Sequence, residues 1–100
     1  MRITDIARHA TSLDGVRQQE SDGLLRWYVD DRLVARQQDA ETVLIRADFD
    51  DRERLVEAHP ATFSVTPRIE GHQKVLADTR RGDLTAVRDA ITAAWELQRR

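Results

Sequence analysis

The pattern of hydrophobic and polar residues predicts a helix near each end of the chain. Apolar residues recur at helical spacing over about residues 3–13, and again from Leu84 to Trp95. Asp14-Gly15 follows the first of these segments, and glycine tolerates the positive φ at which many helices end. Asp83 precedes the second segment and is a residue type that caps helix N-termini. Both helices are expected to be amphipathic.

Strand composition marks the region from residue 24 to residue 47. Three segments rich in β-branched, aromatic or aliphatic residues are separated by short acidic turns. They cover residues 24–29, 32–38 and 42–47. Turns this short join antiparallel neighbours, so the three segments predict a meander. The polar stretch before them, from Val16 to Gly23, is interpreted as a loop or a frayed edge strand.

A central helix is expected after the most apolar of these strands. Asp50 is a good N-cap residue, and Glu53 three residues later would complete a capping box. Pro60 cannot continue a helix, so the helix is predicted over about residues 51–58. Phe63 to Thr66 then alternates apolar and polar residues, which predicts a half-buried strand.

The remaining segments complete a fold of the α+β class. Residues 67–73 are expected to form a loop, residues 74–80 a fifth strand, and Arg81-Gly82 a turn. The predicted order is α-β(3)-α-β(2)-α in a single domain over residues 1–100. One antiparallel five-stranded sheet with helices packed on one face is the natural architecture. The expected core is Leu44 or its neighbours Val43 and Ile45, with Leu55, Phe63, Val75, Leu84, Val87, Ile91 and Trp95.

Composition narrows the classes of function. Hydrophobic residues make up 40% and charged residues of both signs 34% of the 100 residues, which is typical of a small soluble domain. The absence of cysteine removes disulfides, thiolate catalysis and cysteine-ligated metals. No apolar run approaches the roughly 18 residues of a membrane span, and the N-terminus lacks an apolar signal core. We therefore expect a cytoplasmic protein without membrane contact. The net charge of −2 argues mildly against strong non-specific binding of nucleic acid.

The polar residues do not form a recognisable catalytic or cofactor site. The three histidines make no His-x-x-x-His pair, and no serine lies in a Gly-x-Ser-x-Gly elbow. The four glycines are scattered and form no phosphate loop. Two adjacent carboxylate pairs, Asp30-Asp31 and Asp50-Asp51, are better explained as turn and capping residues than as acid–base groups. We therefore expect no catalysis, no cofactor and no metal.

The tryptophans are candidates for packing or for recognition. Trp95 lies on the apolar stripe of the last helix and is expected in the core. Trp27 and Tyr28 are neighbours in a strand, so their side chains point to opposite faces of the sheet. One of them then faces away from the helices, where an exposed aromatic ring is a candidate binding platform.

An ordered set of residues covers most of the chain, from about Leu13 to Leu97. It comprises Leu33-Val34-Ala35-Arg36, Asp51-Arg52-Glu53-Arg54-Leu55, Pro60, Phe63, Val65-Thr66-Pro67, Gly71, Val75-Leu76, Leu84, Val87-Arg88, Ile91 and Ala94-Trp95. This set resembles the MmcQ/YjbR family. The resemblance implies a fold similar to secretion chaperones and to the frataxin-like class, with DNA binding through a double-wing surface and no catalytic motif. Many members have aromatic residues after the Thr-Pro pair, where this chain has Arg68 to Lys74, so base stacking is not expected there.

DNA binding, if the resemblance holds, depends on a local group of basic residues because the whole chain is acidic. Strand alternation predicts that Val34 and Arg36 share one face. Arg36 is then expected to join Arg26 and Arg46 on the face of the sheet away from the helices. The candidate contacts to phosphate are Arg36, Arg46, Arg68, His72, Lys74 and Arg80.

Two hypotheses of function follow. The leading one is a non-enzymatic binding module of the MmcQ/YjbR type whose partner is double-stranded DNA. The alternative is a protein- or small-ligand-binding module that uses the open sheet face and has no nucleic-acid role. Glu70 and Asp78 are expected to oppose some of the positive charge, and a solvated, ion-paired surface is the simplest alternative for the basic residues. In each case we expect a monomer or a weak dimer.

Overall fold

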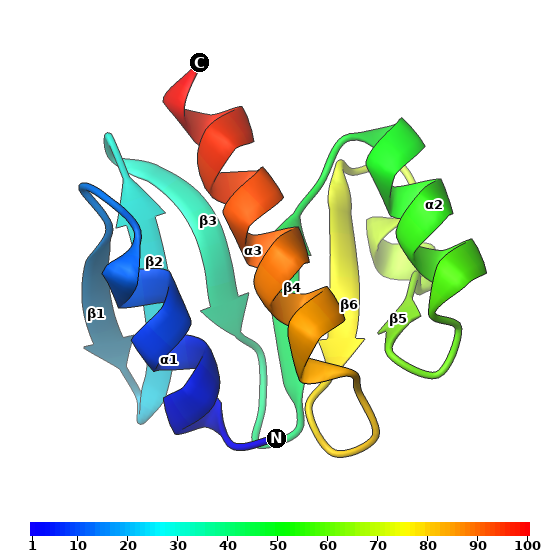
Figure 1. The fold of residues 1–100 in the computed structure, drawn as a ribbon, viewed down its shortest axis with the longest axis horizontal. Coiled ribbons are helices and arrows are strands. Elements are labelled where there is room, and N and C mark those ends of the chain that lie inside the picture. Colours follow the sequence, from blue (N-terminus) through cyan, green and yellow to red (C-terminus); the bar gives the residue numbers. More distant parts are fainter.

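A six-stranded antiparallel sheet forms the centre of the structure, a computed structural model that describes residues 1–100 (Figure 1). The helices are α1 (Ile3–Ser12), α2 (Phe49–Ala58), α3 (Leu84–Arg99) and the short 3₁₀ helix η1 (Pro67–Ile69). The strands are β1 (Arg17–Ser21), β2 (Leu24–Val29), β3 (Arg32–Gln37), β4 (Thr42–Arg46), β5 (Phe63–Ser64) and β6 (Lys74–Asp78). Their order across the sheet is β1-β2-β3-β4-β6-β5, and all neighbours are antiparallel. The predicted α+β class with one antiparallel sheet is confirmed.

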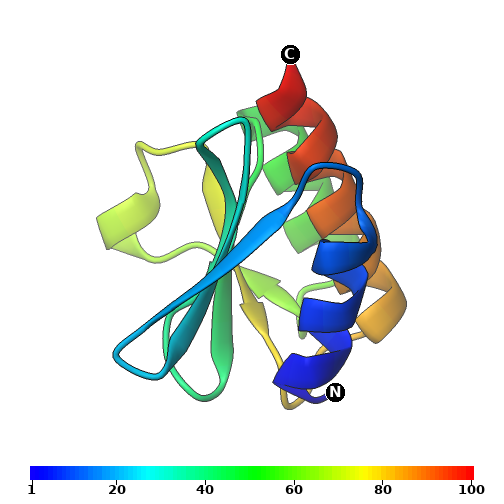
Figure 2. The ribbon, with the colours of Figure 1, turned by 90° about the vertical axis from the view of Figure 1, so that its left-hand side faces the viewer.

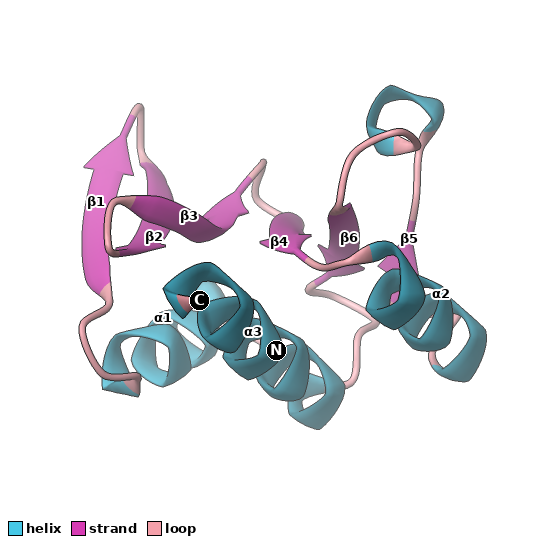
Figure 3. Ribbon diagram, turned by 90° about the horizontal axis from the view of Figure 1, so that it is seen from above, coloured by secondary structure: helices cyan, strands magenta, loops and turns pink.

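The two faces of the sheet are covered differently. Figure 3 shows α1, α2 and α3 on one side of the sheet and η1 on the other. Figure 2 shows the same separation from another side, with the turn between β1 and β2 also projecting away from the helices. We call the face that carries η1 the open face. Its side chains have only η1 and the residues next to it above them.

The sheet contains six strands where the sequence predicted five. The additional strand is β1, in the segment for which a loop or a frayed edge strand was predicted. All five residues of β1 are exposed, so its composition carries no apolar signal. Backbone pairing to β2 holds it, across a turn in which Asp22 and Gly23 have φ of 54° and 77°. The observed order is therefore α-β(4)-α-β(2)-α, with a four-stranded meander in place of a three-stranded one.

The second helix, α2, begins earlier than the sequence predicted. Asp48 is its N-cap, and the Asp48 side chain accepts a hydrogen bond from the N–H of Asp51 at 2.8 Å. Asp50 and Glu53 both lie inside the helix, so the predicted capping box was wrong. The extended backbone of Asp48 lets its carboxylate reach one of the free N–H groups of the first turn.

A β-bulge in β3 changes which side chains share a face. Trp27 pairs with Ala35, whereas the next residue of β2 pairs with Leu33, so Val34 is the extra residue. Val34 and Ala35 are both fully buried in the core under the helices. The prediction that Val34 shares a face with Arg36 was therefore wrong, because strict alternation fails at a bulge.

The core lies between the sheet and the helices and contains seventeen buried residues. Its largest fully buried side chain is Trp27, whose indole N–H donates to the Oε1 of Gln18 at 2.8 Å. The predicted core residues that are buried are Val43, Leu44, Ile45, Phe63, Val75, Val87 and Ile91. The predicted core residues that are only half-buried are Leu55, Leu84 and Trp95. Trp95 lies at the rim, where its indole N–H donates to the carbonyl oxygen of Asp14 at 2.8 Å.

A second, smaller cluster of buried residues lies on the open face. Leu44 and Leu76 pair directly across β4 and β6, and Ile69 of η1 packs against them. This contact fixes η1 over the sheet. It also holds the residues that follow η1 next to the ends of β4 and β6.

Candidate functional site

Two arginines face each other on the open face of the sheet. Arg26 of β2 pairs directly with Arg36 of β3, and Arg36 pairs on its other side with Leu44. Leu44 belongs to the open-face cluster, so all three side chains lie away from the helices. Residues directly opposite in an antiparallel pair have Cβ atoms roughly 4.5–5.5 Å apart. Two arginine side chains therefore start from neighbouring positions on the same face of the sheet.

A second pair of basic residues lies on the next strands. Arg46 of β4 pairs directly with Lys74 of β6, and Arg46 shares the face of Leu44, two residues before it. The Nε atoms of Arg36 and Arg46 are buried and have no hydrogen-bond partner. A buried donor without an acceptor is unfavourable. The hydrogen-bonding capacity of both side chains is therefore not fully used within the protein, as is also the case for Arg88 of α3.

The segment around η1 adds basic side chains above the sheet. Arg68 and His72 line a hollow of about 440 Å³ together with Arg36 and Lys74. The other residues around the hollow are Gln38, Leu44, Thr66 and Ile69. The hollow thus joins basic residues from two strands with basic residues from the η1 segment.

We call Arg26, Arg36, Arg46, Arg68, His72 and Lys74 the basic patch. It contains five of the six residues that the sequence predicted as phosphate contacts, together with Arg26. The structure has four ion pairs, and none of them includes a residue of the patch. The alternative of an ion-paired surface is therefore not supported for these side chains.

Arg80 lies apart from the patch. β6 runs from Lys74 to Asp78, and Arg80 follows its far end, where its guanidinium pairs with Glu41 at 3.2 Å. Asp78 lies at the same far end. Backbone N–H groups of Arg80 and Arg81 donate to its carboxylate and hold the pKa of Asp78 below its usual value. The structure therefore does not bring Arg80 into the patch, nor does it bring the negative charge of Asp78 there.

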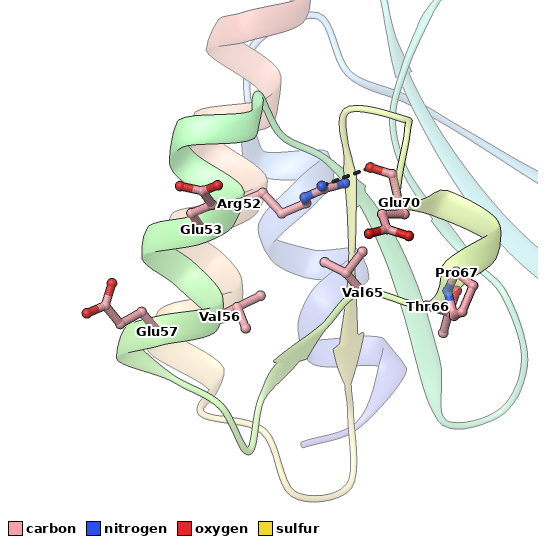
Figure 4. Close-up of a pocket in the computed structure, with 8 residues that line it drawn as sticks. All are labelled: Arg52, Glu53, Val56, Glu57, Val65, Thr66, Pro67 and Glu70. Carbon is pink, nitrogen blue, oxygen red and sulfur yellow. Dashed lines mark hydrogen bonds between the residues drawn. The ribbon is translucent and has the colours of Figure 1, made fainter.

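A groove of different character lies between η1 and α2 (Figure 4). Its volume is about 650 Å³. The residues that line it are Arg52, Glu53, Val56, Glu57, Val65, Thr66, Pro67 and Glu70. Three carboxylates make this groove acidic, whereas the hollow on the open face is basic. Glu70 lines the acidic groove and not the basic hollow.

Arg52 of α2 fixes the backbone of the η1 segment. Its guanidinium donates to the carbonyl oxygens of Ile69 at 3.2 Å, Glu70 at 2.9 Å, His72 at 2.7 Å and Lys74 at 3.5 Å. Figure 4 shows the side chain reaching from the helix to Glu70. The acceptors are backbone atoms, so no spacing of residue types in the sequence signals this contact. Arg52 therefore positions the segment that carries the patch residue His72 without belonging to the patch.

The aromatic side chain on the open face is Tyr28. Trp27 is fully buried in the core, and its neighbour in β2 points to the opposite face. Tyr28 is half-buried and lies two residues from Arg26 on the same face. An aromatic ring therefore borders the basic patch.

The chemistry of the patch suits anions. Five of its side chains are permanently charged at neutral pH, and arginine presents a planar fork of donors that matches phosphate and carboxylate oxygens. No group of three or more acidic or histidine side chains is placed to hold a metal ion. No helix combines the length and the apolar character that crossing a membrane requires.

No protein-family model, curated protein or solved structure matches this chain. The resemblance to the MmcQ/YjbR family therefore stays a prediction from the sequence. The basic patch itself is an observation on this structure and does not depend on that resemblance.

Proposed function

We propose that this protein is a non-enzymatic binding module that contacts the phosphates of double-stranded DNA through the basic patch. The observation that carries the proposal is the direct pairing of like charges across neighbouring strands, without a carboxylate paired to any of them. The pairs are Arg26 with Arg36 and Arg46 with Lys74. Like charges directly opposite each other destabilise a sheet. A ligand with several negative charges would relieve this repulsion.

The extent of the patch favours an extended anion over a compact one. Its residues come from β2, β3, β4, β6 and the η1 segment, so the positive charge is spread across the sheet. A nucleic-acid backbone presents phosphates at regular intervals and matches such a spread. The η1 segment has no aromatic side chain, so we expect contacts to phosphate that carry little sequence discrimination. The resemblance to the MmcQ/YjbR family and the predicted cytoplasmic location agree with this partner.

The number of charges sets the expected strength of binding. If all five permanent cations contact phosphates, the slope of log K against log salt is about −4.5, at −0.9 per contact. The net charge of −2 keeps long-range attraction weak. We therefore expect a dissociation constant of about 10⁻⁴–10⁻⁶ M, the range of non-specific binding.

The test is fluorescence anisotropy with a labelled duplex, from low to physiological salt. A double variant with Arg68→Ala and Lys74→Ala removes two cations of the patch and leaves the core unchanged. We expect weaker binding and a slope that is shallower by about 1.8. We expect no loss of thermal stability, because Arg68 is exposed and the loss of Lys74 removes one of two directly opposed positive charges.

A second double variant, with Arg80→Ala and Arg81→Ala, is the matched control. It removes the same charge from the other end of β6, so its affinity should stay close to that of the wild type. Equal losses in the two variants would mean that net charge and not the patch drives binding. No binding of the wild type even at low salt would refute the DNA proposal.

A small anionic ligand is the second candidate, because the hollow beside η1 concentrates part of the patch. Its volume of about 440 Å³ falls within the range of pockets that hold small molecules, about 300–1,000 Å³. Arg36, Arg68 and Lys74 would surround a phosphate group there, with Thr66 as an additional hydrogen-bonding group. A phosphorylated metabolite is the chemical class that fits.

A competition experiment distinguishes DNA from a small anionic ligand as the partner of the basic patch. A nucleoside monophosphate and inorganic phosphate are added to the complex with labelled duplex at low and constant ionic strength. If the hollow is a small-ligand site, the monophosphate displaces the duplex at concentrations well below those of inorganic phosphate. Equal and weak displacement by both anions would leave duplex DNA as the better account.

A further inference from the structure

The two edges of the sheet differ in how well they are protected. β5 forms one edge and is only two residues long, Phe63 and Ser64, with a proline on each side of the strand at Pro60 and Pro67. β1 forms the other edge and is five residues long. In Figure 1 no other element lies beyond β1. All residues of β1 are exposed, so its outer backbone groups face solvent.

β1 lacks several features that keep edge strands from pairing, namely proline, lysine, a bulge, and a helix or loop that covers the edge. Its charged residues are Arg17 and Glu20. The sequence of β1 is Arg-Gln-Gln-Glu-Ser, and its register with β2 is unbroken from Arg17 to Ser21. The edge is therefore a regular row of free N–H and C=O groups, which can pair with another strand.

The hairpin geometry shows which backbone groups point outward. Ser21 and Leu24 flank a two-residue turn whose central residues both have positive φ, and such flanking residues exchange both backbone hydrogen bonds. Pairs with and without backbone hydrogen bonds alternate along the strand from that point. Glu20 and Gln18 therefore make no backbone hydrogen bond to the residues opposite them in β2. Consistent with this, the N–H of Leu25, opposite Glu20, donates to a side chain of β3 at 3.2 Å. The N–H and C=O groups of Gln18 and Glu20 therefore point away from the sheet.

We propose that β1 pairs with β1 of a second copy of this chain, in an antiparallel arrangement about a twofold axis at Gln19. This register sets Gln18 of each copy opposite Glu20 of the other. The outward groups of these residues then form about four backbone hydrogen bonds, two on each side of the axis. The inference does not depend on the DNA proposal.

The side chains support this register. Gln18 and Glu20 lie on the face of the helices, and the Oε1 of Gln18 already accepts from the indole N–H of Trp27. The amide NH₂ of Gln18 is left free to donate to the carboxylate of Glu20 in the other copy. A register centred on Glu20 would place two carboxylates opposite each other, which is unfavourable. The register centred on Gln19 therefore combines complementary donors and acceptors on both sides of the axis.

The dimer joins the two sheets into one continuous sheet. A twofold axis perpendicular to the sheet keeps the open faces of both copies on the same side. The basic patches would then lie on one surface, separated by the β1 strands of the two copies. The contact between two five-residue strands is small, so we expect weak association, on the order of 1 mM or somewhat tighter.

Sedimentation equilibrium over a wide range of concentrations tests the proposal. The variants are Glu20→Pro, which removes an outward N–H without touching the pairing to β2, and Glu20→Gln, its matched control. The average mass of the wild type should rise with concentration toward that of a dimer, and Glu20→Gln should behave similarly. Glu20→Pro should lose at least about tenfold in association constant, the equivalent of 1.4 kcal/mol. A wild type that stays monomeric at about 1 mM, or a proline variant that associates as well as the wild type, would overturn the proposal.

Amide hydrogen exchange of the wild type covers the case in which the proline variant fails to fold. The amides of Gln18 and Glu20 should become protected as the concentration rises. The amide of Gln19, which is already bonded to β2, should not change. Exchange at Gln18 and Glu20 that is independent of concentration would refute the pairing.

Discussion

The helix-covered face and the open face of the sheet are made from the same strands, but their side chains have different surroundings. On the covered face, seventeen residues pack into one continuous core. On the open face, two strand residues pack against Ile69 of η1, and the cationic side chains around them have no ion partner. The covered face therefore accounts for the stability of the fold. The open face carries unfavourable charge pairs, which is typical of a surface kept for a ligand.

The largest expected difference between the faces is in the free energy of unfolding that a side chain contributes. Two neighbouring residues of β2 measure it. Trp27 is fully buried on the covered face, and Trp27→Ala should destabilise the fold by about 3–5 kcal/mol. Tyr28 is half-buried on the open face and is the matched control. Tyr28→Ala should lower the free energy of unfolding far less. Urea unfolding measures both, and equal losses would contradict the proposed division between the faces.

An effect of intermediate size is expected where α2 holds η1 over the open face. Arg52→Met removes the charged donor to four backbone carbonyls and should cost about 1–3 kcal/mol. Amide exchange should become faster over residues 67–74. Arg54→Met, on the same helix but exposed and paired with Asp51, should cost less than about 0.5 kcal/mol. If the two variants unfold at the same urea concentration, Arg52 does not fix this segment.

The smallest expected effect has the opposite sign. Arg36→Gln removes one of two directly opposed charges on the open face and should stabilise the fold by about 0.2–1 kcal/mol. The same change should weaken the binding of anions. Arg17→Gln is the control, because Arg17 is exposed and already paired with Asp31 at 3.0 Å, so its removal should be close to neutral. A clear loss of stability in Arg36→Gln would mean that Arg36 is a structural residue.

The sequence predicted the elements of the covered face better than it predicted the details of the open face. Apolar periodicity predicted both terminal helices, and the predicted cap of α3 is confirmed by the hydrogen bond from the N–H of Ala86 to Asp83 at 3.2 Å. Strand alternation correctly placed Arg36 and Arg46 on the open face. It failed at Val34, because a bulge depends on how two strands pair and not on the composition of either.

Other features were beyond the reach of composition and periodicity. β1 has no apolar residue, so only its pairing with β2 identifies it as a strand. The choice of Asp48 over Asp50 as the cap of α2 depends on where β4 ends. Arg80 follows β6 too closely in sequence to be separated from Lys74 by pattern, yet the length of the strand separates them in space. Contacts to backbone carbonyls, such as those of Arg52, leave no trace in residue types.

The central claim is that the open face, and not the helix-covered face, binds anions. The most direct measurement is a titration of the ¹⁵N-labelled protein with a short DNA duplex at low salt, followed through backbone and arginine side-chain amide resonances. We predict saturable shifts in β3, β4, β6 and residues 66–74, including the Nε–H resonances of Arg36 and Arg46, with α1 and α3 unchanged. Shifts confined to α1 and α3, or no shifts at any duplex concentration, would contradict the account.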